Sequence, residues 1–356
     1  MDKICDEAQP LVSVVIPVYN AEPFLDELFT SLANQTMKNF VAVIVNDGST
    51  DNSETIIKRW VAKDSRFLSL HQSNKGLSAT RNRALDFIDS LEVQTSYLMF
   101  IDADDMLAPN ALERLYSKAN SDNLDDLIFT SEVFYSSKEM EAKFGHYSEY
   151  YKRNSEYLSI YTGLDYLSEA LGKGDYRPSA CLQFFRSQFI FANGIRFYEG
   201  IIHEDNLFTL KCMTFANRVA FLNEELYIRR VREDSIMTSG ISWKNTDGYF
   251  RCGIESIKLL CEVESELSNK HKESLLSIIR SFFNQALETF LQINEGERRE
   301  LDNRYSNSGK LAEQALFEAV IRLPSDRLTN QKSNHDVSLK NLIKNSVHGV
   351  LKRFQS

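Results

Sequence analysis

VSVVIPVYNAEPFL, residues 12–25, joins a strand to the start of a helix. Its first eight residues are rich in β-branched side chains, which favour strands, and the pattern then predicts an amphipathic helix over Pro23–Gln35. The apolar residues of the strand follow one another without alternation, so both of its faces should be covered by other elements. A strand of this kind followed directly by a helix is typical of a parallel α/β sheet.

The same alternation of strand and helix continues through residue 131. The spacing predicts further strands at 40–47, 67–72 and 97–102, helices at 51–63 and 78–88, and another helix that Pro109 opens. This order indicates an α/β fold with a doubly wound, mostly parallel sheet. Ligands bind such sheets beyond the carboxyl ends of the strands, and here those ends carry Asn, Asp, Gly and Ser residues. We therefore expect a polar cleft along one edge of the sheet, although each segment alone would also suit a turn.

The fourth of these strands ends in a cluster of acidic residues, in YLMFIDADDMLAP (97–109). Two like charges about 4 Å apart repel by about 4 kcal/mol at an effective dielectric of 20, so a positive partner is expected. Asp102 and Asp104 occupy alternate positions and suit an oxygen-bound divalent cation such as Mg²⁺ or Mn²⁺. The alternative is an acidic loop that caps the next helix, and Asp105 is adequate for that role.

Composition excludes several classes of protein. The formal net charge of −9 gives no basic footprint for general nucleic-acid binding. No run approaches the ~18 apolar residues of a membrane span, and the N-terminal residues lack the apolar run of a signal peptide. Five scattered cysteines without a C-x-x-C pair fit a reducing compartment. These features predict a cytoplasmic protein without a nucleic-acid partner.

The rest of the chain divides into regions of different composition. Residues 132–240 are rich in aromatics and contain HEDNLF (203–208) and YIRRVREDS (227–235), while helices are predicted at 254–267, 273–294 and 310–321. We expect a domain over 1–240, with a nucleotide-binding half at about 11–131 and an acceptor half at 132–240. A helical region at 241–323 and a polar linker with a tail helix at 324–356 would follow.

The tail at 337–354 places apolar residues at helical spacing and lysine or arginine mostly elsewhere. A basic amphipathic helix in an acidic protein is typical of a peripheral membrane contact. It would equally suit docking on its own domain or on a second subunit, so oligomer formation stays open.

Four motifs in this order are more specific than any of them alone: VSVVIPVYNAEPFL, VNDGSTDNS (45–53), NKGLSATRNRAL (74–85) and FIDADD (100–105). Together they resemble the family-2 nucleotide-sugar glycosyltransferases of the bacterial cell-surface polysaccharide type, whose catalytic domain has the GT-A fold. The resemblance is strong over 11–131 and weaker to 240, and it does not extend to the C-terminal residues.

The resemblance implies roles for residues of the predicted cleft. Pro17 and Tyr19 match walls of the nucleoside pocket, and Asp47 matches the residue that accepts a hydrogen bond from the base. The positions that complete the nucleotide site are Asn74, Gly76 and Arg81.

The resemblance also implies which residues bind the metal, act as the base and lie near the diphosphate. Asp102 and Asp104 match the metal-binding D-x-D motif, with Asp104 as the direct ligand, but no downstream histidine supplies an obvious third ligand. Asp205 matches the general base, although His203 and Glu204 could compete for a base or metal role, and the triplet alone would suit an N-terminal helix cap. Arg229, Arg230 and Arg232 match a basic segment that closes on the diphosphate, although a solvated strand edge would also explain them. Strand alternation lets at most Arg230 and Arg232 share a face.

The implied reaction is a metal-dependent, inverting transfer of a sugar from a nucleotide sugar, expected to be a UDP-sugar, to a hydroxyl of a glycan or lipid-linked acceptor. A pyrophosphorylase would need a glycine-rich loop after the first strand, where this chain has no glycine. A non-catalytic nucleotide-sugar-binding scaffold is the remaining alternative.

Overall fold

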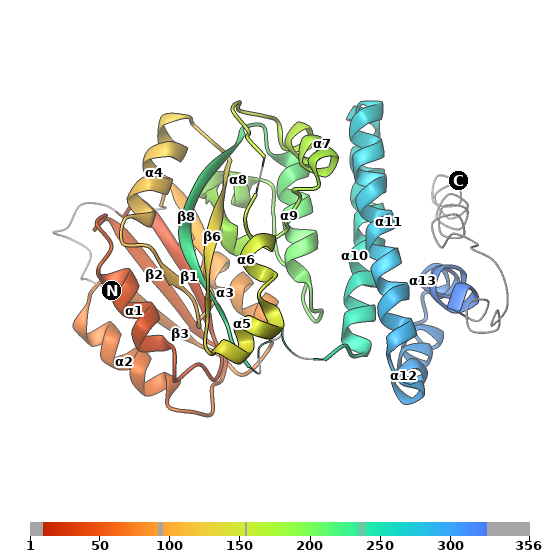
Figure 1. Ribbon diagram of the computed structural model, residues 1–356, viewed down its shortest axis with the longest axis horizontal. Coiled ribbons are helices and arrows are strands. Elements are labelled where there is room, and N and C mark those ends of the chain that lie inside the picture. Colours follow the sequence, from red (N-terminus) through yellow and green to blue (C-terminus); the bar gives the residue numbers. More distant parts are fainter. Residues whose placement is uncertain are drawn as a thin grey trace. The chain divides into compact units, whose positions relative to one another are not determined.

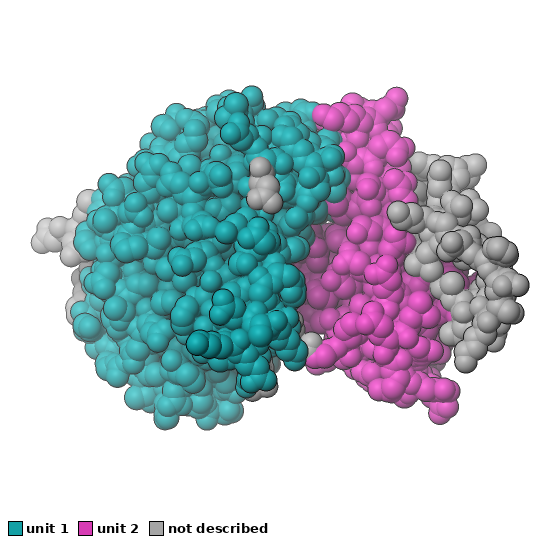
Figure 2. All heavy atoms as spheres, in the orientation of Figure 1, with its two compact units in different colours: residues 1–200, 208–239 teal, residues 201–207, 240–356 magenta. Residues whose placement is uncertain are grey.

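The computed structural model describes residues 10–325 apart from 92–94, 154, 234, 236, 237 and 239. The expected tail helix at 337–354 lies outside the described residues. The chain forms two compact units, coloured separately in Figure 2. Unit 1 comprises residues 1–200 and 208–239, and unit 2 comprises residues 201–207 and 240–356. The segment 201–207 therefore belongs to the second unit although it lies within the domain expected over 1–240.

Unit 1 is built on a mixed, mostly parallel sheet (Figure 1). Across the described residues eight strands follow the order β3-β2-β1-β4-β7-β6-β8-β5. The strands are β1 (Val12–Val18), β2 (Phe40–Asn46), β3 (Phe67–His71), β4 (Tyr97–Phe100), β5 (Met106–Leu107), β6 (Asp126–Tyr135), β7 (Gln183–Arg186) and β8 (Val219–Val231). β1 pairs in parallel with β2 and β4, and β7 is antiparallel to both β4 and β6. The predicted doubly wound α/β class is confirmed.

The strand order determines which face of the sheet the helices of unit 1 cover. They are α1 (Leu25–Ala33), α2 (Ser53–Lys63), α3 (Leu77–Asp89), α4 (Ala111–Ser121), α5 (Lys138–Phe144), α6 (Tyr147–Tyr150), α7 (Gly163–Lys173), α8 (Ser187–Ala192) and α9 (Glu204–Phe215), which begins in unit 2. The chain moves outward from β1 to β3 and then returns past β1 to β4. Right-handed crossovers therefore place α3 on the sheet face opposite α1 and α2. The reversal makes the β1/β4 boundary the switch point at which ligands bind such sheets.

The burial of the central strands explains why they could be predicted from the sequence. Every residue of β1, β2 and β4 is buried, as uninterrupted apolar runs require. β3 differs, because it is an edge strand and only Phe67 is buried. The expectation that Pro109 occupies the first helical position was wrong, since α4 begins at Ala111 and Asn110 is its N-cap residue.

The described part of unit 2 after Gly240 consists mainly of helices. It contains α10 (Trp243–Val263), α11 (Asn269–Gln292), α12 (Glu295–Ser306) and α13 (Leu311–Phe317), and α10 packs along α11 (Figure 1). Gly253 permits that packing, because a Cβ atom there would lie 2.6 Å from the ring of Phe283. The sequence pattern located parts of α10, α11 and α13, but it placed the start of α10 too late and missed α12.

Candidate functional site

Asp47, directly after β2, organises the loop that follows β3. Its carboxylate accepts hydrogen bonds from the side-chain amide of Gln72 and from the backbone N–H groups of Lys75 and Gly76, each at 2.8 Å. Gly76 has φ of 88° and is the N-cap of α3, so these bonds also set where that helix begins. An ionised carboxylate has about four acceptor positions. The loop donors occupy three of them. Asn74, in the same loop, is exposed.

The loops after β1 and β2 are joined to each other. Asn20 has φ of 49°, and its side-chain oxygen accepts from the backbone N–H of Thr50 at 2.7 Å. Its own N–H donates to Ser49 Oγ at 3.0 Å. These bonds hold the backbone beside Tyr19, whose side chain is 51% exposed, while Pro17 is buried inside β1. Tyr19 is therefore free to present its ring to a ligand.

Asp102, directly after β4, forms an ion pair with a buried arginine. Arg81 of α3 is 1% exposed, and its Nη2 lies 2.9 Å from Asp102 Oδ1. Burial alone would raise the pKa of Asp102, but the charges of Arg81 and Arg229 outweigh it and hold that pKa below its usual value. Arg81 thus directly neutralises one carboxylate of the D-x-D motif.

Asp105 does not cap a helix, so that expectation was wrong. It is 2% exposed, and its carboxyl group accepts from the Tyr227 hydroxyl and, at 2.7 Å, from the backbone N–H of Arg230. The Tyr227 oxygen accepts in turn from the backbone N–H of Asp102 at 3.2 Å. Burial and the neighbouring charge of Asp104 raise the pKa of Asp105 to about 8. Asp105 therefore serves as a structural link between β8 and the D-x-D turn.

Asp104 is held by the two arginines that were expected to share a strand face. Arg232 Nε lies 2.6 Å from Asp104 Oδ2, and Arg230 Nε donates to the Asp104 backbone carbonyl at 2.9 Å. Both guanidinium groups lie over the ring of Phe24, with centroid distances of 4.7 Å for Arg232 and 5.3 Å for Arg230. Arg230 also pairs with Glu27 of α1. Together these contacts join α1, the D-x-D turn and the end of β8.

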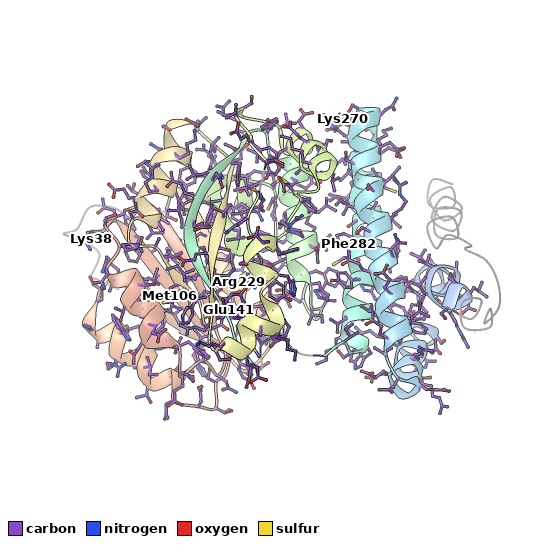
Figure 3. The ribbon with its side chains drawn as sticks, in the orientation of Figure 1. Lys38, Met106, Glu141, Arg229, Lys270 and Phe282 are labelled. Atoms are coloured by element: carbon purple, nitrogen blue, oxygen red, sulfur yellow. The ribbon has the colours of Figure 1, made fainter. Side chains whose placement is uncertain are left out.

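Arg229 matched the basic segment but was left out of the predicted site, yet it belongs to the same electrostatic group. It lies on β8 near α5 and α6 (Figure 3), with its guanidinium 4.7 Å from the ring centroid of Tyr151. Its charge acts on both Asp102 and Asp105. Strand alternation had excluded it from the face shared by Arg230 and Arg232. Tyr227 carried no sequence signal that separates it from an ordinary core tyrosine.

Asp205 lies in the first turn of α9, within the segment that belongs to unit 2. The preceding residue, Glu204, is 8% exposed, and His203 has φ of 66°. His203 Nε2 lies 3.2 Å from the side-chain nitrogen of Asn245, and its ring stacks on Tyr249. The residues around Asp102 and Asp104 thus belong to unit 1, whereas the segment that carries Asp205 belongs to unit 2.

Comparison with known proteins assigns the family. The family model for glycosyl transferase family 2 matches residues 13–185, which include β1 to β4, the Asp47 loop and the D-x-D turn. Residues 13–185 carry a domain of glycosyltransferase family 2. The resemblance seen in the four sequence motifs is thereby confirmed.

Relatives of this glycosyltransferase support the assignment. GlyA of Streptococcus pneumoniae is 32% identical over 63% of this chain and 31% of its own length. EpsJ of Bacillus subtilis, an uncharacterized glycosyltransferase, is 31% identical over 64% of this chain and 63% of its own length. The chain thus spans less than two thirds of both relatives. YibD of Escherichia coli, also uncharacterized, is 28% identical over 82% of this chain and 80% of its own length.

Solved structures share the fold. Residues 1–349 of TarS from S. aureus, in complex with UDP-GlcNAc, superpose with a TM-score of 0.64 at 21% identity. This match covers 96% of the present chain and 89% of the TarS chain. The mannosyltransferase PcManGT of Pyrobaculum calidifontis, with GDP-Man and Mn²⁺, gives a TM-score of 0.51 at 13% identity. The predicted GT-A fold with a helical C-terminal region is confirmed.

The D-x-D turn offers two carboxylates to a divalent cation. Within residues 10–325, leaving out the short gaps, no group of three or more His, Cys, Asp or Glu side chains could hold a metal. Mg²⁺ commonly uses one or two carboxylates and completes its shell with water and substrate phosphate oxygens. Asp102 and Asp104 provide such a pair, and each has one oxygen engaged by an arginine. The residues therefore fit a substrate-completed site better than a resident ion.

Proposed function

We propose that this chain transfers a sugar from a UDP-sugar to a hydroxyl of a glycan or lipid-linked acceptor, with inversion at the anomeric carbon. The observation that carries the proposal is the cluster of arginines around Asp102 and Asp104 at the switch point of a family-2 domain. TarS, a structural neighbour, binds UDP and UDP-GlcNAc. A teichoic acid poly(glycerol phosphate) polymerase of Staphylococcus epidermidis is among the relatives, at 30% identity over 32% of its length. A role in cell-surface polysaccharide synthesis fits both comparisons.

The nucleoside would bind at the ends of β1, β2 and β3. Tyr19 would supply an exposed ring for stacking on the base, and Pro17, buried in β1, would form a further wall of the pocket. Asp47 retains an acceptor position for an N–H group of the base after its bonds to Gln72, Lys75 and Gly76. The exposed residues Asn74 and Gly76 would border the same site.

The diphosphate would bind beside the D-x-D turn. Arg230 and Arg232 supply charge, and Arg81 is already committed to Asp102 in the protein interior. Arg232 is the group best placed to exchange partners, because its side chain is 25% exposed and it can donate to a phosphate as well as to Asp104. A bound Mn²⁺ or Mg²⁺, held by Asp104 with Asp102, would neutralise charge on the leaving diphosphate.

Asp205 would act as general base. In a single displacement the acceptor oxygen forms a bond to the anomeric carbon as the bond from that carbon to the diphosphate oxygen breaks. The hydroxyl proton passes to the Asp205 carboxylate. A positioned base of this kind contributes about 10²–10⁴-fold to the rate.

The testing experiment is a thermal-unfolding panel with UDP, UDP-GlcNAc, UDP-glucose, UDP-galactose and GDP-mannose, each with Mn²⁺ and with EDTA. A ligand at about 100 times its dissociation constant stabilises the folded state by about 2.7 kcal/mol. We expect a Tm increase with UDP compounds that is larger with Mn²⁺ and absent with GDP-mannose. UDP release then separates an enzyme from a scaffold, because a scaffold would be stabilised without turnover. Absence of any shift would contradict the proposal.

The tail at 337–354 bears on how the protein reaches a lipid-linked acceptor. No helix of the described chain is long and apolar enough to cross a membrane. We propose that the basic, amphipathic tail binds the surface of anionic membranes near a lipid-linked acceptor. Pelleting with phosphatidylglycerol vesicles should decrease when the chain ends at Asn330. Equal pelleting of both forms would contradict this part of the proposal.

A further inference from the structure

One face of α10 holds the segment that leads to Asp205. Residues Asn245, Gly248, Tyr249 and Cys252 occur at helical positions i, i+3, i+4 and i+7, which lie on one side of a helix. All four meet Ile202 or His203, and all of these residues belong to unit 2. The helical region is therefore in direct contact with the residues that precede the candidate base.

The contacts are close and of different kinds. A Cβ atom on Gly248 would lie 2.4 Å from the carbonyl oxygen of Ile202, so only glycine allows this approach. The rings of His203 and Tyr249 stack with centroids 4.1 Å apart and an interplanar angle of 15°. Cys252 Sγ lies 3.6 Å from the His203 carbonyl oxygen, to which its thiol donates. The backbone carbonyl of Ile202 and both the ring and the carbonyl of His203 are therefore in contact with α10.

His203 controls the direction in which α9 starts. Its φ of 66° is in the left-handed region, which is unfavourable for a residue with a side chain and persists only where surrounding contacts enforce it. Its carbonyl accepts from the backbone N–H of Asn206 at 3.1 Å and from the Asn206 side-chain amide at 3.2 Å. Asp205 lies between these two residues. Its backbone position is therefore fixed by the conformation of His203.

The hydrogen bonds also select the tautomer of His203. The side-chain oxygen of Asn245 accepts from the backbone N–H of Ser242 at 2.9 Å, in the capping box of α10. The amide nitrogen of Asn245 consequently faces His203 and donates to Nε2 at 3.2 Å. His203 then carries its proton on Nδ1. Burial lowers the pKa of His203 to about 4, so the ring stays neutral near pH 7.

We propose that His203 and the α10 face formed by Asn245, Gly248, Tyr249 and Cys252 are positioning residues that orient Asp205 for proton transfer. In this proposal the helical unit contributes to catalysis because it orients the base. This inference rests on the proposed function, in which Asp205 is the base. It assigns no contact with substrate to the α10 residues.

The first test compares Tyr249→Ala with Tyr249→Phe, which keeps the ring stack. The rate is UDP release from the UDP-sugar that gives the largest thermal shift in the panel. We expect kcat of Tyr249→Ala to fall roughly 10²-fold, as when a catalytic group is misplaced by about 1 Å. KM for the donor and the UDP-induced thermal shift should not change, and Tyr249→Phe should behave as wild type. Lys258→Ala, at an exposed position of the same helix, is the control.

The second test is Asn245→Asp, which keeps the oxygen that caps α10 but places a carboxylate against His203 Nε2. The ring must then hold a proton on Nε2, so the acidic limb of the pH dependence of kcat should shift, which a purely structural defect would not cause. Should Tyr249→Ala fail to fold, this variant decides. Unchanged kcat and pH profile in both variants would overturn the inference.

Asp205→Asn, measured in parallel, separates the two proposals. If it abolishes UDP release while the α10 variants behave as wild type, only the positioning role fails. If it leaves UDP release unchanged, the proposed base is wrong, and the positioning role fails with it.

Discussion

The carboxylates of the two units are held in opposite ways. Asp102 and Asp104 in unit 1 are held by charge, through Arg81 and Arg232. The segment leading to Asp205 in unit 2 is held by close packing and by a neutral, partly buried histidine. A charge-held group can exchange its partner for an ionic ligand, whereas a packed segment keeps its geometry through the reaction. This difference suits a site that admits a charged donor and a base that must stay in place.

The largest expected effect on stability is at the buried ion pair. Asp102→Asn removes the negative charge that lies against the buried Arg81 guanidinium, and removing one partner of a buried pair costs about 3–5 kcal/mol. We expect a loss near the lower end, because the side chain of Asp102 is 26% exposed. Urea unfolding at pH 7 measures it. The double variant Arg81→Met/Asp102→Asn should recover part of the loss.

The control for that variant is an exposed pair on α12. Arg299 and Glu295 lie 2.8 Å apart with side chains 74% and 78% exposed, so Glu295→Gln should change stability little. Equal losses for Asp102→Asn and Glu295→Gln would contradict the view that burial makes the Arg81 pair important.

The next effect tests the packed segment. Gly248→Ala adds a methyl group against the Ile202 carbonyl, and overpacking costs roughly 1–3 kcal/mol, set against a gain of up to about 1 kcal/mol in helix propensity. We expect net destabilisation. Gly172→Ala is the matched control, because that helical glycine is exposed and a Cβ atom there meets nothing within 4 Å. Stabilisation by both substitutions would contradict the close contact.

The third prediction concerns pH. The pKa of His203 is about 4 in the folded protein, below the value of about 6.5 for an unperturbed histidine. Between these values the unfolded chain binds a proton that the folded chain does not, so the free energy of unfolding decreases as pH falls. Tyr249 and Cys252 of α10 and the adjacent Glu204 are the other titratable groups near the ring. Comparing urea unfolding from pH 7 to 5 for wild type and His203→Asn should give a steeper decrease in wild type, and equal slopes would contradict the assignment.

The smallest effect on stability is expected at Arg232. Its pair with Asp104 is partly exposed, so Arg232→Gln should cost at most about 1 kcal/mol. The same change should weaken binding of UDP, measured by titration calorimetry with Mn²⁺, because the diphosphate loses a charged donor. Unchanged UDP affinity would show that Arg232 serves only Asp104.

Local patterns predicted much of the fold but not the partners of the charged groups. β1 and β2 were evident because their apolar runs are fully buried. α12 was missed because Leu301 and Tyr305 are its only buried residues within the described chain. The start of α10 was missed because polar residues and glycine dominate its first turns, where Gly248 contacts the Asp205 segment.

In the candidate site, too, local patterns did not predict contacts between residues that are far apart in the chain. Alternation correctly paired Arg230 with Arg232, since it depends only on strand geometry. The link between Asp102 and Arg81, and the link from Asp105 to Tyr227, join segments far apart in the chain. Asp105 was therefore taken for a helix cap on local grounds, although a tertiary contact determines its environment.

The most direct measurement of the central claim compares wild type and Asp205→Asn for UDP binding and for UDP release from the selected UDP-sugar, both with Mn²⁺. We expect equal UDP affinity in the two proteins and a rate of UDP release that falls about 10²–10⁴-fold in the variant. Equal release rates would contradict the role of Asp205. Failure of the wild-type protein to bind UDP would contradict the donor site itself.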